Sequence, residues 1–325
     1  MITSERKWRK MKQNKEPNVT IIIPTHSAPI DTVVAALRKQ KYTGKVTIIA
    51  LDNGERDRTK EMPKGVTYIK NKQNLGLAGS LNKGILLAST PYVITLHQDC
   101  VPVGSDWLSA LMLPFADSSV VLSASQQILP KEIWNKFSFW HKVFAVPELQ
   151  MQKTIHERAT VYKTSVVEEC GLFDNTTYLT AGEDADLFMK MKAYGKFVVS
   201  SALVSHIHAP HNDSLWKFIK TFLRCHEAMG VLHRKYLFRM GFQFVYDLVK
   251  TVLMLFLVVF LFFNVGVSLF IFGVIVVLAN IMHLGVVRYV CDWRLVFVPF
   301  VYTFVWFATL IVMWKGFVSG KQRIH

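Results

Sequence analysis

The chain has 325 residues, a formal net charge of +15 and a hydrophobic fraction of 51%. Its length suggests about two domains, and its four scattered cysteines form no CxxC pair, which argues against a disulfide framework or a zinc site. The soluble part is therefore expected in a reducing cytosol. The positive charge fits an anionic membrane surface or a phosphate-bearing ligand. Nucleic acid is not an expected partner, because the basic residues gather next to apolar segments and no nucleic-acid-binding motif is present.

After a basic tail over residues 1–17, which lacks the apolar segment of a signal peptide, the sequence alternates between two periods. The short runs "NVTIIIP", "KVTIIALD" and "PYVITLHQD" predict strands, the β-branched ones buried on both faces. Between them, "IDTVVAALRKQ" and "GSLNKGILLAST" have helical spacing. This alternation predicts an α/β domain over residues 18–212, with a parallel sheet and crossover helices.

Polar residues follow three of the predicted strands, as 24–26 (Pro-Thr-His), 52–54 (Asp-Asn-Gly) and 97–99 (His-Gln-Asp). Ligands of such sheets bind at the carboxyl ends of the strands, and unpaired polar groups are costly to bury in a core. We therefore expect these residues at the mouth of a binding site. A turn without ligand contacts is the alternative, since Asp-Asn-Gly is a common turn sequence.

Three carboxylates stand close together in "AGEDADLFMKM", where Glu183, Asp184 and Asp186 open a predicted helix. Negative charge at a helix N-terminus is favoured by the helix dipole, and this structural interpretation suits Asp186 best. A carboxylate in a site can also act as a general base that takes the proton from an attacking hydroxyl. Serine and cysteine nucleophile motifs are absent from the sequence.

Two histidines, His206 and His208, follow the strand-like run "FVVSSALVS". Alternate residues of a strand point to the same face, so we expect both rings to face one spot. A lone histidine is more often structural, whereas two at this spacing favour a functional pair. The sequence leaves open which of the two is the ligand.

Residues 213–240 have an amphipathic pattern, with Leu215 and Ile219 on one face and Lys217 and Arg224 on another. An ordinary surface helix accounts for this pattern. The position just before a long apolar run favours instead an interfacial helix that lies on lipid headgroups. Its basic face, which includes Arg224, is then placed to meet the diphosphate of a donor or of a lipid acceptor.

Residues 241–318 are a predicted transmembrane region, followed by a tail over residues 319–325. Because about 20 apolar residues span a bilayer as a helix, we expect spans at 242–263, 266–287 and 295–314. The near absence of charge in these spans argues against a transporter. We therefore expect a multi-pass membrane protein with a cytosolic α/β domain. Three spans place the basic C-terminus outside, against the positive-inside tendency, and a re-entrant third segment would remove that conflict.

The order of these motifs resembles family 2 glycosyltransferases of the GT-A fold, a Rossmann-like fold for nucleotide-diphosphate sugars. The resemblance covers about residues 18–225 and includes rhamnosyl- and mannosyltransferases and enzymes like dolichol-phosphate mannose synthase. It implies an inverting enzyme that transfers a sugar from a nucleotide-diphosphate donor, usually with a divalent metal. The segments that carry it are "VTIIIPTH", "LDNGERDRT", "NLGLAGSLNKGI", "YVITLHQDCVP", "ECGLFDNTTYLTAGEDADLFMKMKAYG" and "ALVSHIHAPHNDSLWKFIKTFLR".

The segment 97–99 stands where the family has its DXD motif, and the resemblance implies that Asp99, with His206 or His208, binds Mn²⁺ or Mg²⁺ on the donor diphosphate. His97 replaces the family's first aspartate. An imidazole ligates manganese or donates a hydrogen bond to phosphate or ribose, but it brings no negative charge.

The same resemblance implies that Asp52 contacts the nucleotide base and that residues 24–26 form the first nucleotide-contacting loop. Gly76 lets the backbone approach a ligand closely, and Asn82 resembles a characteristic asparagine of that segment. For catalysis, the resemblance implies Asp184 as the general base, with Glu183 orienting it or substituting for it. The expected donor-binding residues are Pro24, Thr25, His26, Asp52, Asn53, Gly76, Asn82, His97, Gln98 and Arg224.

We therefore expect a membrane-bound hexosyltransferase that moves one sugar from a GDP-, UDP- or dTDP-sugar to a lipid-linked acceptor at the cytosolic membrane face, in glycan biosynthesis. The QxxRW signature of processive synthases is absent, which favours single-sugar transfer. One alternative acceptor is a simple polyprenyl phosphate, which is glycosylated by dolichol-phosphate mannose synthases. A nucleotide-sugar-binding scaffold without activity is the alternative that His97 supports. The sequence leaves the sugar, the acceptor and the oligomeric state open.

Overall fold

The computed structural model describes residues 16–207, 214–281 and 284–323. The chain divides into two compact units. The first unit comprises Met1–Lys136, Pro147–Asn175 and Glu183–Pro210, and the second comprises Phe137–Val146, Thr176–Gly182 and His211–His325. Two short segments inside the predicted α/β domain thus cluster with the C-terminal helices. The functional boundaries near residues 212 and 240 stay predictions.

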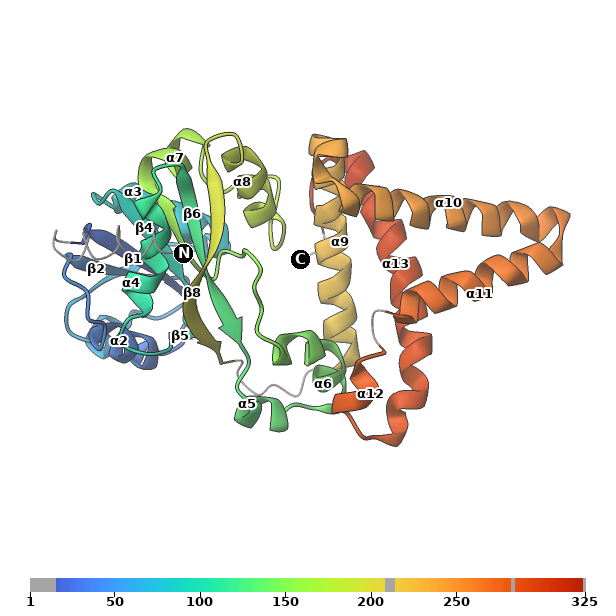
Figure 1. The fold of residues 1–325 in the computed structure, drawn as a ribbon, viewed down its shortest axis with the longest axis horizontal. Coiled ribbons are helices and arrows are strands. Elements are labelled where there is room, and N and C mark those ends of the chain that lie inside the picture. Colours follow the sequence, from blue (N-terminus) through green and yellow to red (C-terminus); the bar gives the residue numbers. More distant parts are fainter. Residues whose placement is uncertain (1–15, 208–213, 282–283, 324–325) are drawn as a thin grey trace. The chain divides into compact units, whose positions relative to one another are not determined.

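The first unit is built on one eight-stranded sheet with the strand order β3-β2-β1-β4-β7-β6-β8-β5 (Figure 1). The runs that predicted strands form β1, β2, β4 and β8. The strands are β1 (Val19–Thr25), β2 (Val46–Asp52), β3 (Val66–Lys70), β4 (Tyr92–Leu96), β5 (Cys100–Pro102), β6 (Val120–Ile128), β7 (Ala159–Lys163) and β8 (Lys196–His206).

The prediction of a parallel sheet is correct for most of this sheet, including the β6–β8 pair, and wrong for β7 and β5. Strand β1 pairs in parallel with β2 and β4, and β2 pairs in parallel with β3. Strand β7, however, runs antiparallel to both β4 and β6, and β5 runs antiparallel to β8. A hydrophobic run indicates that a strand is buried, but the connections set its direction, and the sequence analysis identified no elements between β6 and β7.

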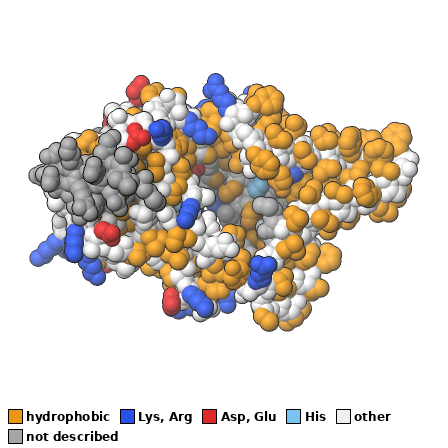
Figure 2. Space-filling model, in the orientation of Figure 1, with side chains coloured by type: hydrophobic (Ala, Val, Ile, Leu, Met, Phe, Trp, Pro, Cys, Tyr) orange, Lys and Arg blue, Asp and Glu red, His pale blue; other side chains and the backbone are white. Residues whose placement is uncertain are grey.

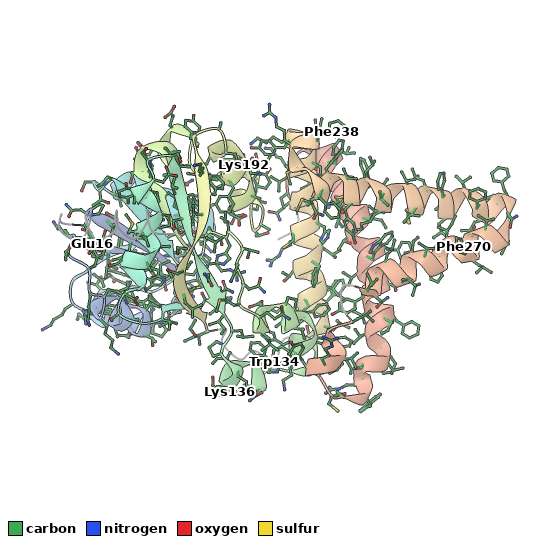
Figure 3. The ribbon with its side chains drawn as sticks, in the orientation of Figure 1. Glu16, Trp134, Lys136, Lys192, Phe238 and Phe270 are labelled. Carbon is green, nitrogen blue, oxygen red and sulfur yellow. The ribbon has the colours of Figure 1, made fainter. Side chains whose placement is uncertain are left out.

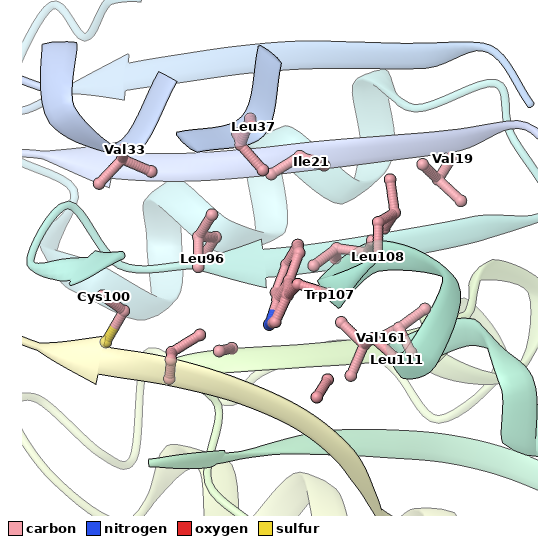
Figure 4. Packing of buried hydrophobic residues seen from close by; sticks show 14 of the residues in the cluster. Val19, Ile21, Val33, Leu37, Leu96, Cys100, Trp107, Leu108, Leu111 and Val161 are labelled. Carbon is pink, nitrogen blue, oxygen red and sulfur yellow. The ribbon is translucent and has the colours of Figure 1, made fainter. Parts of the chain in front are cut away.

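Helices cover both faces of the sheet, each over its own hydrophobic core. Side chains of α2 and α4 pack on one face, and side chains of α3, α7 and α8 pack on the other. Figure 4 shows the first core, in which Trp107 and Cys100 are fully enclosed. The helices of this unit are α2 (Asp31–Arg38), α3 (Gly76–Leu87), α4 (Trp107–Met112), α5 (Lys131–Asn135), α7 (Thr164–Glu169) and α8 (Glu183–Met191), with short 3₁₀ turns η1 (Thr59–Glu61), η2 (Leu113–Ala116) and η3 (Val146–Leu149).

The second unit is helical in its described residues. The predicted amphipathic segment forms α9, and the predicted spans correspond to α10, to α11 and to a last helix, α13. The predicted span 266–287 is not one continuous helix, because α11 ends at Ile281 and residues 286–289 form a separate turn. The elements are α6 (Phe139–Ala145), α9 (Leu215–Tyr236), η4 (Leu237–Met240), α10 (Phe242–Phe263), α11 (Val265–Ile281), α12 (Val286–Tyr289), η5 (Trp293–Phe297) and α13 (Val298–Ser319).

Two helical segments, Phe242–Phe263 and Trp293–Ser319, are long and apolar enough to cross a membrane. Only 11% of the apolar stretch of the first is buried, so α10 is not the core helix of a globular domain. Figure 2 shows hydrophobic side chains over the α10–α11 hairpin, and in Figure 3 the labelled Phe270 lies on α11, where it is 73% exposed. Large exposed hydrophobic surfaces of this kind are unusual in a protein surrounded by water.

Charged residues in α10 are confined to its first turns and are buried. Asp247 accepts a hydrogen bond from Gln243 at 2.8 Å, lies 2.9 Å from the His233 ring, and is 3.5 Å from the Lys250 ammonium group. The Lys250 ammonium group also lies over the rings of Tyr246 and Trp306. The predicted spans were expected to carry essentially no charge. In the structure, Asp247 and Lys250 at the start of α10 pair with each other inside the unit.

Helices α9 and α13 approach each other through two glycines. A Cβ atom added to Gly230 in α9 would lie 1.8 Å from the carbonyl oxygen of Met313 in α13. A Cβ atom added to Gly316 in α13 would lie 2.0 Å from the carbonyl oxygen of Glu227 in α9. Small residues let helix backbones pack closely where lipid offers no hydrophobic drive for association. The amphipathic helix therefore packs along α13, and its expected position on lipid headgroups stays a prediction.

We expect Gly230→Ala to destabilise the second unit by about 1–3 kcal/mol, the usual cost of overpacking, because the new methyl group has no space between α9 and α13. The measurement is denaturant or thermal unfolding of the full chain in detergent. Gly273→Ala in α11 is the matched control, since nothing lies within 4 Å of its added Cβ. The close helix contact would be contradicted if both variants kept the stability of the wild type.

Candidate active site

Asp52 fixes the loop that follows β1 to the end of β2. Its carboxylate is fully buried and accepts hydrogen bonds from the backbone N–H groups of Ser27 (3.0 Å) and Gly54 (2.8 Å) and from the Tyr68 hydroxyl (3.0 Å). Burial alone would raise the pKa of Asp52, but these hydrogen bonds and the charge of Arg58 lower it below its usual value. Ser27 has a φ of 55°, a left-handed conformation that the bond to Asp52 holds in place.

Asn53, the next residue, fixes the turn before α3. Its side-chain amide donates to the Gly76 carbonyl at 3.1 Å, and its side-chain oxygen accepts from the Leu75 N–H at 3.1 Å and from Asn71 at 3.0 Å. Gly76 has a φ of +69°, and nothing lies within 4 Å of an added Cβ. The backbone of Gly76 is therefore open on one side, where a ligand can approach it closely.

These turns form one wall of a cavity of about 370 Å³ at the carboxyl ends of β1, β2 and β4. The 97–99 segment forms the other wall, and the Gln98 side chain accepts a hydrogen bond from the His26 N–H at 3.3 Å. Of the cavity residues, Asn74 and Leu77 were not predicted from the sequence. Asn74 caps the turn by accepting from the Gly76 N–H at 2.8 Å. The cavity is lined by Pro24, Thr25, His26, Asn53, Asn74, Gly76, Leu77, His97, Gln98 and Asp99.

The structure does not bring every predicted donor-binding residue to this cavity. Asp52 lies behind the wall, with both oxygens bonded to its own chain. Asn82 exchanges two hydrogen bonds with the backbone of Phe173, at 2.8 and 2.9 Å, which ties α3 to the loop after α7. Arg224 belongs to the second unit. His208 lies outside the described residues, so its expected role as a metal ligand stays a prediction.

A grouping able to hold a metal ion lies at one side of the cavity, where β5 pairs with β8. The ligand atoms of Asp99, Cys100 and His206 lie within 4.8 Å of one another, and the Asp99 carboxylate is 3.4 Å from the His206 ring. A hard divalent cation prefers oxygen and imidazole nitrogen to sulfur. Asp99 and His206 therefore fit such an ion, whereas burial raises the pKa of the Cys100 thiol well above its usual value and keeps the thiol neutral.

Charge pairing shapes the ionisation of this grouping. Burial would raise the pKa of Asp99, but the hydrogen bond and the positive charge of His206 lower it well below its usual value. Burial would lower the pKa of His206, but Asp99 and Glu148 outweigh that effect and raise it. Glu148 lies 3.4 Å from the His206 ring, and the Gln127 amide lies 2.9 Å from it. The imidazole is thus held by partners on both of its nitrogens, as metal-binding histidines usually are.

A second chain of ionisable groups runs from the cavity to α8. The His97 ring lies 3.5 Å from the carboxylate of Glu157, and the charge of Glu157 acts in turn on Asp184 in α8. Burial lowers the pKa of His97 to about 4, so its ring is neutral at neutral pH. Burial, followed by the neighbouring Glu157 charge, raises the pKa of Asp184 to about 7.

The other two carboxylates of α8 differ from Asp184. Glu183 is buried, and burial followed by the charge of Asp184 raises its pKa to about 7. Asp186 is also buried and forms an ion pair with Lys190 at 2.7 Å, one turn along the helix. Asp186 is therefore a structural residue of α8, in line with its interpretation as a helix-start carboxylate.

Three residues of the segment before β7 were missed by the sequence analysis. Glu157 joins His97 to Asp184, and one guanidinium nitrogen of Arg158 lies 3.5 Å from the His206 ring and 3.5 Å from the Gln127 oxygen. His156 is the third, and burial lowers its pKa to about 4. These residues carry no periodic or motif signal in the sequence. Only the pairing of β7 with β4 brings them beside the 97–99 segment.

The fold is that of the GT-A class, an α/β sheet with a ligand cavity at the carboxyl ends of its strands. The chain is similar to a mannosyltransferase from Pyrobaculum calidifontis that was solved in complex with GDP-Man and Mn²⁺. The similarity covers 98% of this chain and 94% of that chain, with a TM-score of 0.55 and 14% sequence identity. At this identity the likeness shows the fold alone.

The family follows from the sequence of the same domain. The family model described as glycosyl transferase family 2 matches residues 20–166, a segment that runs from β1 through β7. Residues 20–166, a little under half of the chain, therefore match a family 2 glycosyltransferase domain. The chain is also 32% identical over 96 residues to the UDP-forming cellulose synthase catalytic subunit of Xanthomonas axonopodis pv. citri (strain 306). That match covers 27% of this chain and 13% of the relative's length.

Proposed function

We propose that this glycosyltransferase moves a single sugar, with inversion, from a nucleotide-diphosphate sugar to a lipid-linked acceptor at the cytosolic face of a membrane. The observation that carries the proposal is the arrangement of two ionisable groupings beside one cavity. Asp99 and His206 offer ligands for a divalent cation, and Asp184, beside the charge of Glu157, is a carboxyl group with a raised pKa. Leaving-group stabilisation and proton removal are the two tasks of inverting glycosyl transfer.

The donor is assigned to the cavity between the β1 loop and the 97–99 segment. The open backbone at Gly76 and the polar groups of His26 and Asn53 suit a nucleotide and its diphosphate. Mn²⁺ or Mg²⁺ bound by Asp99 and His206 supplies charge neutralisation for the diphosphate. The mannosyltransferase of similar fold was solved with GDP-Man and Mn²⁺, so GDP-mannose is the first donor to test. UDP-sugars follow, because the cellulose synthase match is UDP-forming.

Asp184 is assigned as the base that accepts the proton of the acceptor hydroxyl. A pKa of about 7 matches a base to neutral conditions, because the group is partly ionised there and still a strong proton acceptor. The neighbouring charge of Glu157 contributes to this raised pKa. Glu183, the preceding residue, is buried beside it and takes a supporting role.

The membrane assignment rests on α10, α11 and α13. We infer that the α10–α11 hairpin inserts into the bilayer and that α13 forms a further span or re-entrant segment. Two of these helices have the length and composition for crossing, and a lipid-linked acceptor is the substrate class that such an anchor would serve. The chain segments that precede and follow the hairpin, near Gly241 and Arg294, are then both on the cytosolic side.

We expect Asp99→Ala to abolish metal-dependent binding of GDP and UDP, because it removes the only carboxylate of the candidate metal grouping. Isothermal titration of each nucleoside diphosphate, with and without Mn²⁺, measures the effect. Asp117→Ala, which removes an exposed carboxylate elsewhere in the same unit, is the control. Metal-dependent binding that persists unchanged in Asp99→Ala would refute the assignment.

We expect Asp184→Asn to lower turnover by about 10²–10⁴-fold, the usual contribution of a general base, while donor affinity stays nearly unchanged. In the wild type, turnover should rise with pH through about 7, since the base works only after its carboxyl group has lost the proton. Steady-state transfer between about pH 5 and pH 9 measures both effects.

The control for that variant is Asp31→Asn, at the exposed start of α2. Near-normal turnover of Asp184→Asn would remove Asp184 from the role of base. It would favour Glu183, or an acceptor that is already an ionised polyprenyl phosphate and needs little help from a base.

The hairpin is testable by cysteine labelling in cells. Cys291 is exposed and precedes η5, and Asn264 lies in the turn between α10 and α11. A membrane-impermeant maleimide should label Asn264→Cys in intact cells and should label Cys291 only after permeabilisation. The background variant Cys225→Ser/Cys291→Ser provides the control. Labelling of Cys291 in intact cells would overturn the proposed topology.

A further inference from the structure

The C-terminal segment of the second unit ends in a side chain that is enclosed by protein. Gln322 is 2% exposed, and its side-chain oxygen accepts hydrogen bonds from three successive backbone N–H groups. The donors are Leu179 at 2.8 Å, Thr180 at 2.9 Å and Ala181 at 3.3 Å. Successive N–H groups that converge on one point form a cradle of the kind that binds anions, and here the cradle holds the amide oxygen of Gln322.

The remaining polar groups of Gln322 are also bonded. Its side-chain amide donates to the Arg224 carbonyl in α9 at 3.1 Å, and its backbone N–H donates to the Thr177 carbonyl at 3.0 Å. The next backbone N–H, that of Arg323, donates to the buried Glu227 carboxylate at 2.8 Å. The side-chain oxygen and the side-chain amide of Gln322 both bond to backbone groups, which makes this a specific connection and not a chance surface contact.

The loop that Gln322 holds leads directly into the helix of the proposed base. Gly182 follows Ala181 and has a φ of +94°, with an added Cβ only 2.9 Å from Ala228 of α9. The next two residues are Glu183 and Asp184, the start of α8. Only Gly182 therefore separates the loop bound by Gln322 from the first residue of that helix.

We propose that Gln322 is a positioning residue for catalysis, which fixes the 177–182 loop and thereby the start of α8. The inference rests on the proposed role of Asp184 as the base. Without the Gln322 side chain, three successive backbone N–H groups of the loop lose their shared acceptor, and the loop is then free to shift toward other partners. The C-terminal residues of the helical unit then become part of the machinery that places Asp184.

The test compares Gln322→Ala with Lys321→Ala in the full-length protein in detergent. Lys321 is the matched control, because its side chain is exposed and the hydrogen bonds recorded for it use only its backbone. Three quantities are measured: the hydrogen exchange of the 179–181 amides, the rate of steady-state transfer, and the affinity for the donor. We expect faster exchange, turnover lowered by about 10²-fold, and donor affinity within about twofold, all in Gln322→Ala alone.

A conservative variant, Gln322→Glu, keeps an acceptor oxygen for the loop and removes the donor to Arg224. We expect it to retain slow exchange at the 179–181 amides and turnover between those of wild type and Gln322→Ala. It also serves as the test if Gln322→Ala does not fold. A loss of folded protein alone would lower the apparent turnover in proportion to the folded fraction, which the donor-binding stoichiometry reports.

The outcomes separate this inference from the proposed function. If wild-type turnover depends on Asp184 and Gln322→Ala matches Lys321→Ala, the positioning role is wrong. The same conclusion follows if turnover falls while the exchange of the 179–181 amides stays unchanged. If the wild type shows no turnover that depends on Asp184, the proposed base is wrong and the positioning role, which rests on it, is overturned with it.

Discussion

The site depends on the pairing of ionisable groups that the fold buries at one end of its sheet. Asp99, His206, Glu157 and Asp184 are all at least partly removed from water, and isolated charges in such places are costly. The structure meets this constraint by pairing Asp99 with His206 and by placing Asp184 against Glu157. One pair lowers the pKa of its carboxylate and the other raises it. The same sheet edge thus offers a permanently ionised ligand and a group that exchanges protons near neutral pH.

The second unit meets a different constraint, since its helices expose hydrophobic surface that no water-facing protein would keep. Its internal contacts are therefore specific ones: the two glycines between α9 and α13, the buried ion pair at the start of α10, and the C-terminal segment bonded to α9. Gln322 and the 177–182 loop pack within this unit, and the loop continues along the chain into α8. That covalent continuity is the route by which the helical unit would influence the proposed base.

Much of the site was predictable because parallel strands bring their carboxyl ends to one edge. Pro24, Asn53 and Asp99 lie far apart in the sequence, yet three strand ends predict their meeting, and they line one cavity. The direction of β7 was not predictable, since hydrophobic runs do not encode it. Glu157 was missed for that reason, because its contact with the 97–99 segment exists only through the antiparallel pairing of β7. Asn82 has a family-like position, but its hydrogen bonds go to the Phe173 backbone.

The proposed mechanism depends most on Asp184, a carboxyl group that takes up and releases a proton near pH 7. Infrared titration of the full-length protein measures this directly, with Asp184→Asn and Glu157→Gln used to assign the carboxyl band. Glu183 and Asp184 should both contribute protonated carboxyl groups with midpoints near pH 7. The Asp184 contribution should be lost in Asp184→Asn and shifted to lower pH in Glu157→Gln, where the neighbouring charge is gone. A spectrum in which every carboxyl group is ionised by about pH 5, close to the ordinary values for exposed groups, would contradict it.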